Sequence, residues 1–387
     1  MHDAIIVGGG IAGSATALRL ARHGHSVVLL DRERFPRDKV CGEGLMPHGV
    51  AALRELGVGE AVAAFAQPFE GIRYLADDEV AIGRFSGEPG WGLRRIALDQ
   101  VVHAAARAAG VQVRDGVVAK AVAVDDRGVR VTTDQGVLRG RAVVGADGLH
   151  SLVRRAIGSR VKQAENQRYG ARLHLKLAAE VSRTVDVYLA DRIEYYVTPV
   201  SHEVVNVAVL CGKDTTRGLG GDLSAQLWAR LRAEPALQHW IEGAVPVSEA
   251  AITGPLRQQA TRLVGDRAVL VGDAAGFVDA ITGEGMSLAL ASARFAADTL
   301  HAGLTADRLS QAALAPYEAQ RRRHARDQVA FTEIVLWWIR RPWLRRRIVR
   351  NLARRPGIFD RLLEVNTGAR APWRFPPRDL LGLAFGV

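Results

Sequence analysis

The 387-residue sequence predicts an α/β fold in which a Rossmann-like domain is interleaved with an antiparallel β-sheet domain, followed by a helical C-terminal arm. Three observations predict it. A short apolar run opens the chain and breaks into a glycine-rich turn and an Ala-rich helical pattern. Residues from about 165 to 262 alternate in a β fashion. Residues beyond 320 combine arginine with tryptophan and aliphatic side chains at helical spacing.

The glycine-rich turn carries the pattern G-x-G-x-x-G at Gly8, Gly10 and Gly13. Gly8 makes the tight turn, Gly10 lets the backbone approach a pyrophosphate, and Gly13 lets helix and strand pack closely. The helix that follows offers free N–H groups and the positive end of its dipole to phosphates. A second buried strand, 26–31, ends in Asp31, where adenosine ribose hydroxyls need an acceptor. This context favours a site for an unspecified dinucleotide over a plain turn.

The loop after Asp31 leads into a Gly-Glu-Gly segment, Gly42 to Gly44. It is either a plain turn or backbone brought close to a cofactor, and its place just beyond the βαβ unit favours the cofactor. A short helix is expected over 48–56, because Pro47 suits a first helical turn and Gly57 closes it.

The middle of the chain is expected to alternate between the two domains. Short β-like segments over 71–89 precede a helix over 100–109 and a small meander over 111–139. A buried strand at 142–146 and a Rossmann-type strand at 267–273 return to the first domain, and a long helix follows over 284–301. The strands and helix of the second domain are expected at 169–177, 185–189, 194–200, 204–210 and 223–232.

These patterns divide the chain into three parts. The dinucleotide-binding domain takes residues 1–75, 95–160 and 263–320. The β-sheet domain, which we expect to bind the substrate, takes 76–94 and 161–262, and the basic helical C-terminal region takes 321–387.

The net charge of +11 is concentrated in one segment. Residues 321–355 hold twelve arginines against Asp327 and Glu333, a local charge of +10. Such a segment, interspersed with Trp and aliphatic residues, either lies on an anionic membrane surface or packs on the catalytic body with a solvated Arg face. No nucleic-acid recognition module accompanies it, so nucleic-acid binding is not expected.

The remaining composition narrows the protein class. Two cysteines, Cys41 and Cys211, cannot form a disulfide framework, which favours a reducing compartment and a cytoplasmic protein, peripheral at most to a membrane. No apolar run is long enough to span a bilayer, and no basic segment precedes the first strand as in a signal peptide. We predict no metal site, and the sequence does not indicate an oligomeric state.

Three separated motifs together carry a family resemblance. They are the N-terminal fingerprint, Asp147-Gly148 after a buried strand, and Gly272-Asp273 after another. Over about residues 1–320 the chain resembles the FAD-dependent oxidoreductases of the group A flavoprotein monooxygenase and geranylgeranyl reductase superfamily. The resemblance implies that Asp273 binds a ribityl hydroxyl and that Asp147 serves the pyrophosphate region and the approach of a nicotinamide cofactor. It also implies that Arg95, or its rival Arg94, contacts the FAD phosphate and ribityl region.

The physical argument for Asp273 is independent of the family, because a buried carboxylate at a strand end needs partners such as ribityl hydroxyls. The alternative is a helix N-cap. The helix that begins near Gly285 would aim its N-terminus at the flavin edge that gains negative charge on reduction.

Two segments resemble the geranylgeranyl reductase branch: 41–44 and 279–285. Gly276, Ala280 and Ser287 depart from the ordinary hydroxylase pattern. The segment 195–199 lacks the Trp and Phe of the reductase motif Tyr-x-Trp-x-Phe-Pro, and the halogenase motif Trp-x-Trp-x-Ile-Pro is absent. The branch implies these FAD contacts: Ala12, Asp31, Cys41, Gly42, Gly44, Arg95, Val118, Asp273, Gly285 and Met286.

Cys41, Tyr195 and Tyr196 are the candidate catalytic residues. Cys41 is either a small buried hydrophobe or a thiol that shapes the site or donates a proton. The two tyrosines alternate on a strand, so only one can face the site. Glu43 and His48 are possible acid–base groups, although their positions are more typical of a solvated loop.

We expect a NAD(P)H-dependent FAD monooxygenase that hydroxylates a lipophilic aromatic or polyketide-like substrate of secondary metabolism. The first alternative is geranylgeranyl-reductase-like reduction of prenyl or lipid double bonds, with hydride leaving the flavin and a site acid supplying the proton. The second is a non-catalytic prenyl- or lipid-binding protein on the same fold.

Overall fold

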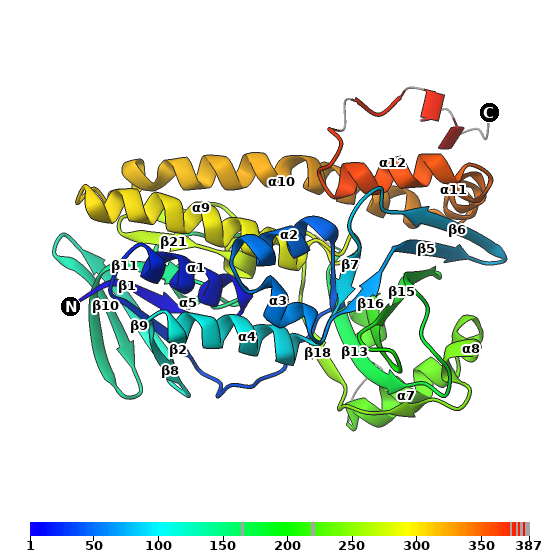
Figure 1. Cartoon of the computed structure of the whole chain (residues 1–387), viewed down its shortest axis with the longest axis horizontal. Coiled ribbons are helices and arrows are strands. Elements are labelled where there is room, and N and C mark those ends of the chain that lie inside the picture. Colours follow the sequence, from blue (N-terminus) through cyan, green and yellow to red (C-terminus); the bar gives the residue numbers. More distant parts are fainter. Residues whose placement is uncertain (164–165, 218–220, 372–373, 377, 380–381, 384–387) are drawn as a thin grey trace.

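The N-terminal strand β1 lies inside an eight-stranded sheet with the order β20–β21–β11–β1–β2–β8, from which β10 and β9 extend beside β11. The computed structural model describes residues 1–163, 166–217, 221–371, 374–376, 378–379 and 382–383 (Figure 1). The strands β21, β11, β1, β2 and β8 are parallel neighbours, as a Rossmann-like domain requires. The bounds in this sheet are β1 (His2–Val7), β2 (Val27–Asp31), β8 (Gln112–Asp115), β9 (Ala119–Asp125), β10 (Gly128–Thr133), β11 (Gly136–Gly145), β20 (Val264–Gly265) and β21 (Ala268–Leu270).

Strand β11 differs from the expected pattern of two short strands broken near Gly140. It runs without a break from the hairpin with β10 into the parallel sheet. Gly140 does not form a turn. It allows β11 to pack closely against Ile5 of β1, because a Cβ at position 140 would lie 2.9 Å from Ile5 Cγ1. The segment expected to open the meander is β8, which pairs in parallel with β2.

Helices cover this sheet and include the long helix expected near residue 284. Helix α1 packs against α4 and α9, and Figure 1 shows all three over the sheet. Helix α4 begins at Arg95, five residues before its expected start, because the distant Glu43 side chain accepts the Arg95 N–H at 2.7 Å. The helices of this part are α1 (Ile11–Arg22), α2 (Pro47–Glu55), α3 (Gly59–Ala63), α4 (Arg95–Ala108), α5 (Leu152–Ala156), the 3₁₀ turn η2 (Gly272–Ala275) and α9 (Gly285–Thr305).

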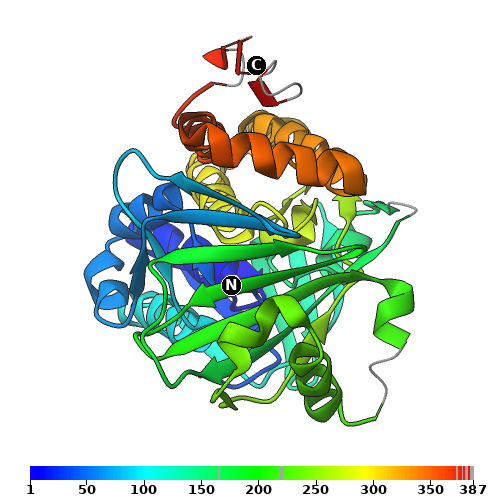
Figure 2. The ribbon, with the colours of Figure 1, turned by 90° about the vertical axis from the view of Figure 1, so that its right-hand side faces the viewer.

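The second large sheet has the order β17–β13–β16–β15–β14–β5–β6, with β18 beside β13 (Figure 2). All its pairs are antiparallel except β14 with β5. The domain boundary that the sequence placed between residues 75 and 76 falls inside β5. Its bounds are β5 (Gly71–Ala76), β6 (Glu79–Arg84), β13 (Arg168–Lys176), β14 (Thr184–Leu189), β15 (Ile193–Pro199), β16 (Val204–Gly212), β17 (Val245–Pro246) and β18 (Ala251–Thr253).

Short elements join the two large sheets and cover the second one. Two three-stranded sheets have the orders β3–β7–β4 and β12–β19–β22. Their bounds are β3 (Gly44–Leu45), β4 (Gln67–Phe69), β7 (Gly90–Gly92), β12 (Val161–Gln163), β19 (Gln258–Ala260) and β22 (Gly276–Phe277). The remaining helices of this region are α6 (Lys213–Arg217), α7 (Leu223–Arg232), η1 (Pro235–Leu237) and α8 (Gln238–Ile241).

Three helices form the C-terminal arm: α10 (Gln311–Ile339), α11 (Pro342–Arg354) and α12 (Pro356–Asn366). Helix α10 begins ten residues before position 321 and packs on α9, while α11 and α12 pack on β6 (Figures 1 and 2). The Tyr74 ring of β5 lies 4.8 Å from the Phe359 ring and 6.2 Å from the Trp338 ring, centroid to centroid. The fold class expected from the sequence is confirmed, including this arm. Within the described ranges, we find no helix with the length and hydropathy to span a bilayer.

The close approach of α1 to β1 gives a first prediction. A Cβ at Gly13 would lie 1.9 Å from the carbonyl oxygen of Gly8, a backbone atom that cannot move aside. We therefore expect Gly13→Ala to lower the free energy of unfolding by about 1–3 kcal/mol. Gly87→Ala is the control, because a Cβ there meets nothing within 4 Å. Urea unfolding measures the difference, and equal midpoints for the two variants would contradict the packing role of Gly13.

Candidate active site

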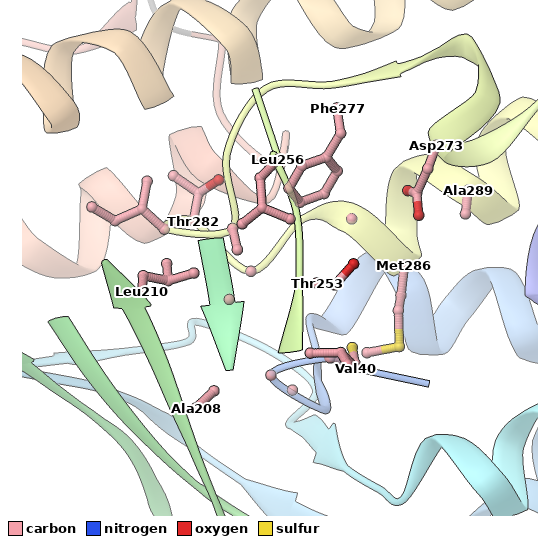
Figure 3. A pocket seen from close by; sticks show the side chains of 18 of the residues that line it. Val40, Ala208, Leu210, Thr253, Leu256, Asp273, Phe277, Thr282, Met286 and Ala289 are labelled. Carbon is pink, nitrogen blue, oxygen red and sulfur yellow. The ribbon is translucent and has the colours of Figure 1, made fainter. Parts of the chain in front are cut away.

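One cavity of about 1570 Å³ lies between the two large sheets and reaches the C-terminal arm. Most of the site residues expected from the sequence line it. Figure 3 shows Asp273, Met286 and Ala289 at one end, and Ala208, Leu210 and Thr282 at the other. The lining includes Gly8, Gly10, Ala12, Asp31, Cys41, Gly42, Gly44, Arg95, Val118, Asp147, Tyr196, Asp273, Gly285 and Met286.

Two expected residues are not part of this lining. Gly13 lies behind the glycine turn, where it permits close packing as described above. Tyr195 is 1% exposed and belongs to the core on the far face of the second sheet, beside Leu227 and Leu231 of α7. Tyr196 is therefore the tyrosine that faces the cavity, and its hydroxyl donates to the Ile281 carbonyl at 3.3 Å.

The glycine turn is held in place by Asp31. Its Oδ2 accepts the N–H of Gly9 at 2.7 Å, and Oδ1 accepts the N–H of Glu33 at 2.9 Å. The Arg37 guanidinium lies 3.6 Å from the same carboxylate. Helix α1 begins at Ile11 without a side-chain cap, so its first N–H groups are available to an anionic ligand.

Asp147 combines a structural bond with an unsatisfied atom. Its Oδ2 accepts the N–H of Leu152 at 2.6 Å and so stabilises the start of α5. Its Oδ1 is buried and finds no hydrogen-bond partner within the described residues, although the residue lines the cavity. A Cβ at neighbouring Gly148 would meet nothing within 4 Å. A ligand hydroxyl or amide beside this backbone would satisfy the carboxylate.

Asp273, in η2 at the end of β21, pairs with Lys39 from the loop after β2. The Lys39 ammonium donates to Asp273 Oδ2 at 2.9 Å. Burial raises the pKa of the carboxyl, but the charge and hydrogen bond of Lys39 together with the charges of Arg95 and Arg321 lower the net pKa below the usual range. Sequence reasoning missed Lys39, because it stands 234 residues before Asp273 and only the fold brings the two side chains together.

Arg95 lines the cavity, whereas its rival Arg94 is not among the lining residues. Arg95 is 3% exposed and makes a bidentate ion pair with Asp99 one turn along α4. Arg37 donates to the same carboxylate at 3.2 Å. Burial opposes the charge, but Asp99 and the neighbouring Cys41 raise the pKa of Arg95 overall, so the guanidinium stays charged. Two cations therefore lie at this wall of the cavity.

The segment from Cys41 to Gly44 is built around Glu43. The position of Glu43 in the sequence suggested a solvated side chain, but the side chain is buried. Glu43 Oε1 accepts the Arg95 N–H, and Oε2 lies 2.6 Å from His174 Nε2 on β13. The Glu43 N–H donates to Cys41 Sγ at 3.3 Å, which fixes the thiol beside the cavity. A Cβ at Gly42 would meet nothing within 4 Å, so the backbone there faces open space.

Helix α9 presents its N-terminus to the cavity at Gly285 and Met286, and no side chain caps it. The preceding Glu284 is buried and pairs with His48 Nε2 at 2.8 Å. Burial raises the pKa of this carboxyl, and His48 offsets only part of the rise. Asn366 of α12 donates to Glu284 at 2.9 Å, so the arm is bonded to the start of α9. His48 is therefore part of a built network and not of a solvated loop.

The other end of the cavity is apolar and extends between the second sheet and the arm. Arg347 of α11 lines this end, whereas a buried ion-pair cluster lies behind the wall, where Arg168 pairs with Glu194 and lies 3.4 Å from Asp279. Apolar lining residues come from both sides: Phe69, Ile72, Tyr74, Val185, Val187, Leu210, Leu256, Ile281, Phe331, Val335, Trp338, Leu344, Ile348, Leu352, Phe359, Leu362 and Leu363.

The charged end of this cavity fits FAD. It supplies uncapped helix N-termini for phosphates, cations from the loop, an unsatisfied buried carboxylate oxygen and glycines whose backbone a ligand can approach. A sequence model of an FAD binding domain matches residues 1–332. The chain belongs to this family of FAD binding domains.

Known relatives place the chain among oxidoreductases. Menaquinone reductase of Mycobacterium tuberculosis is 29% identical over 327 residues, which is 77% of this chain and 76% of the relative. Digeranylgeranylglycerophospholipid reductase 2 of Methanosphaera stadtmanae is 24% identical over 76% of each chain. A probable FAD-dependent monooxygenase from Pseudomonas aeruginosa shares the fold, with a TM-score of 0.75 and 24% identity over 88% of this chain and 97% of its own.

The superfamily expected from the sequence is therefore confirmed, and the protein is an FAD-dependent oxidoreductase. The alternative of a non-catalytic prenyl- or lipid-binding protein is therefore rejected. Among the described residues no group of three or more His, Cys, Asp or Glu side chains is arranged to hold a metal ion.

The Lys39–Asp273 pair gives a second prediction. Asp273→Ala removes the acceptor expected for a flavin hydroxyl and leaves the Lys39 charge uncompensated. We expect FAD affinity to fall roughly ten- to a hundredfold, as a lost charged hydrogen bond costs about 1.5–3 kcal/mol. Asp307→Ala is the control, because that carboxylate pairs with Arg141 at the surface. Titration of the apoprotein with FAD measures both, and an unchanged dissociation constant for Asp273→Ala would remove Asp273 from the FAD site.

Proposed function

We propose that the protein reduces a carbon–carbon double bond in the long hydrocarbon chain of a lipophilic substrate. The observation that carries the proposal is the length and apolar character of the cavity beyond its charged end. The whole cavity, including the charged end where FAD would bind, measures about 1570 Å³, whereas drug-sized sites usually measure about 300–1,000 Å³. A compact aromatic ring would fill little of the part between β5, β14 and the arm, whereas a prenyl or acyl chain matches its shape and lining.

Two of the relatives support the same direction. One of them is named for menaquinone and another for a digeranylgeranyl glycerophospholipid, and both names describe reductases. The two segments that resemble the geranylgeranyl reductase branch, 41–44 and 279–285, both contribute to the cavity wall. Counted back from Pro199, the missing Trp and Phe of the reductase motif correspond to Tyr196 and Thr198, and both of these residues line the cavity. The departure therefore changes the cavity side of β15.

The bound flavin would supply a hydride to one alkene carbon, and the protein would supply a proton to the other. Tyr196 is the proposed proton donor, because it lines the cavity. Burial and the neighbouring Glu194 raise its pKa well above the ordinary value, which keeps the hydroxyl protonated but also makes it a weaker acid. Cys41 is the second candidate on the cavity wall. The apolar lining excludes water and orients the chain.

We propose NAD(P)H as the reductant. A cavity whose flavin end is lined by Arg37, Lys39 and Arg155 offers cations to a phosphorylated nicotinamide cofactor. The cytoplasmic location expected from the cysteine content would give access to this reductant and remains a prediction.

The monooxygenase expected from the sequence is the second candidate. The dry apolar wall around Phe277 and Ile281 would also suit oxygen insertion into a lipophilic aromatic or polyketide-like substrate. Its requirement for molecular oxygen separates it from the reductase.

A third prediction concerns oxygen. Under anaerobic conditions, NAD(P)H and a polyprenyl lipid should give a product heavier by two hydrogens, and the flavin should return to its oxidised spectrum as the alkene is added. Mass spectrometry of the lipid measures the gain. A product that forms only with oxygen and gains one oxygen atom would establish the hydroxylation instead.

A fourth prediction separates the two tyrosines. Tyr196→Phe removes the proposed proton donor and should lower kcat roughly 10²-fold or more, with little change in flavin content. Flavin reduction by NAD(P)H should be unaffected, because only the second half-reaction needs the proton. Tyr195→Phe is the control on the opposite face of β15. Equal rates for both variants would assign the proton to another group, with Cys41→Ala the next test.

A further inference from the structure

We propose that the mouth of the cavity docks on an anionic lipid bilayer, with Ile334, Trp337 and Trp343 inserted among the lipids. We call these three residues, together with Arg341 between α10 and α11 and Arg347 and Arg354 of α11, the mouth face. The inference is carried by exposure, helical spacing and charge, and it rests on the proposed function only for the identity of the substrate that would pass through the mouth.

The three apolar residues lie at the opening of the cavity. Each lines the cavity and is nevertheless largely exposed: Ile334 is 61%, Trp337 56% and Trp343 67% exposed. A side chain can meet both conditions only where the cavity opens to the outside. Large apolar side chains that gather at one exposed place indicate an interaction site.

The spacing of these residues places arginines around them. Ile334, Trp337 and Arg341 follow one another at intervals of three and four on α10 and just beyond it, and the Arg341 guanidinium lies 4.2 Å from the Trp337 ring centroid. On α11, Arg347 and Arg354 follow Trp343 at four and eleven residues and so share its face.

The charge of this region matches a negatively charged surface. Most of the local +10 charge between residues 321 and 355 has no acidic counterpart in the same segment. Among the described residues, four arginines of this segment pair with acids: Arg350 with Glu79 at 2.7 Å, Arg346 with Asp77 at 3.9 Å, Arg322 with Glu318 at 2.7 Å and Arg326 with Asp327 at 2.9 Å. Glu333 of α10 pairs with Arg257, outside the segment, at 2.5 Å. Attraction of about 1 kcal/mol per basic side chain to an anionic leaflet would then add to the insertion of tryptophan at the interface.

A bilayer explains the position of the mouth better than another protein chain does. The apolar wall continues from Trp337 and Trp343 through Trp338 and Leu344 to Phe359, so a hydrocarbon chain could pass from the lipid to the interior without crossing water. No described helix spans the membrane, so the contact would be peripheral.

The test measures partition of the purified flavin-loaded protein onto phosphatidylcholine vesicles with and without phosphatidylglycerol, by co-sedimentation. We expect binding only to the anionic vesicles, and weaker binding at high salt. Trp337→Ala with Trp343→Ala should lower the partition coefficient roughly tenfold or more. Arg347→Gln with Arg354→Gln should lower it roughly 30-fold.

Two matched controls remove similar groups far from the mouth face. Val137→Ala with Val245→Ala removes exposed apolar area, as these side chains are 56% and 54% exposed. Arg107→Gln with Arg130→Gln removes two surface charges. Both should bind vesicles like the wild type. Flavin absorbance confirms that each variant is folded.

Three outcomes would overturn the proposal: no wild-type binding to anionic vesicles at low salt, equal losses in the mouth-face and control variants, or a dimer that the tryptophan substitutions dissociate in the absence of lipid. The last would assign the face to a second copy of the chain. Because vesicle binding needs neither substrate nor reductant, a failure of the proposed reaction would leave this result unchanged.

Discussion

The cavity depends on one buried carboxylate, Glu43. It is 1% exposed, and its two oxygens join parts that are distant in sequence: the N-terminus of α4 through Arg95 and strand β13 through His174. His174 in turn lies 2.9 Å from Ser248. A carboxylate taken out of water is costly unless such bonds are all made. These bonds hold the segment from Cys41 to Gly44 in the cavity wall, between α4 and β13.

The cavity separates charge from apolar surface along its length. Lys39, Arg95 and the helix N-termini lie at one end with Asp147 and Asp273, so a dinucleotide would replace water with fixed partners. Beyond Met286 the walls become aliphatic and aromatic. A reactive ring held between the two ends would face a dry environment on one side only, which strengthens every electrostatic interaction made there.

The sequence was most informative where the chemistry is local. The glycine turn, the strand ending in Asp31 and the long helix after Gly283 follow from patterns within a few dozen residues, and the fold confirmed them. Sequence reasoning failed where a distant group decided the outcome. Helix α4 starts at Arg95 because of Glu43, and Gly140 continues a strand because Ile5 packs against it. The Lys39–Asp273 pair, the burial of Glu43 and the pairing of His48 with Glu284 had no sequence signal, since each needs partners from another layer.

The order of strands in the first sheet has a consequence for synthesis of the protein. Strand β1 lies between β2 and β11, and β11 completes its other edge with β21, which ends at Leu270. About two thirds of the chain must therefore leave the ribosome before the sheet is complete, and such distant pairings form slowly. Helix α1 also lacks a partner until α9, Gly285–Thr305, has been made, a condition that promotes aggregation. The N-terminal half of this molecule should thus depend on chaperones more than its length suggests.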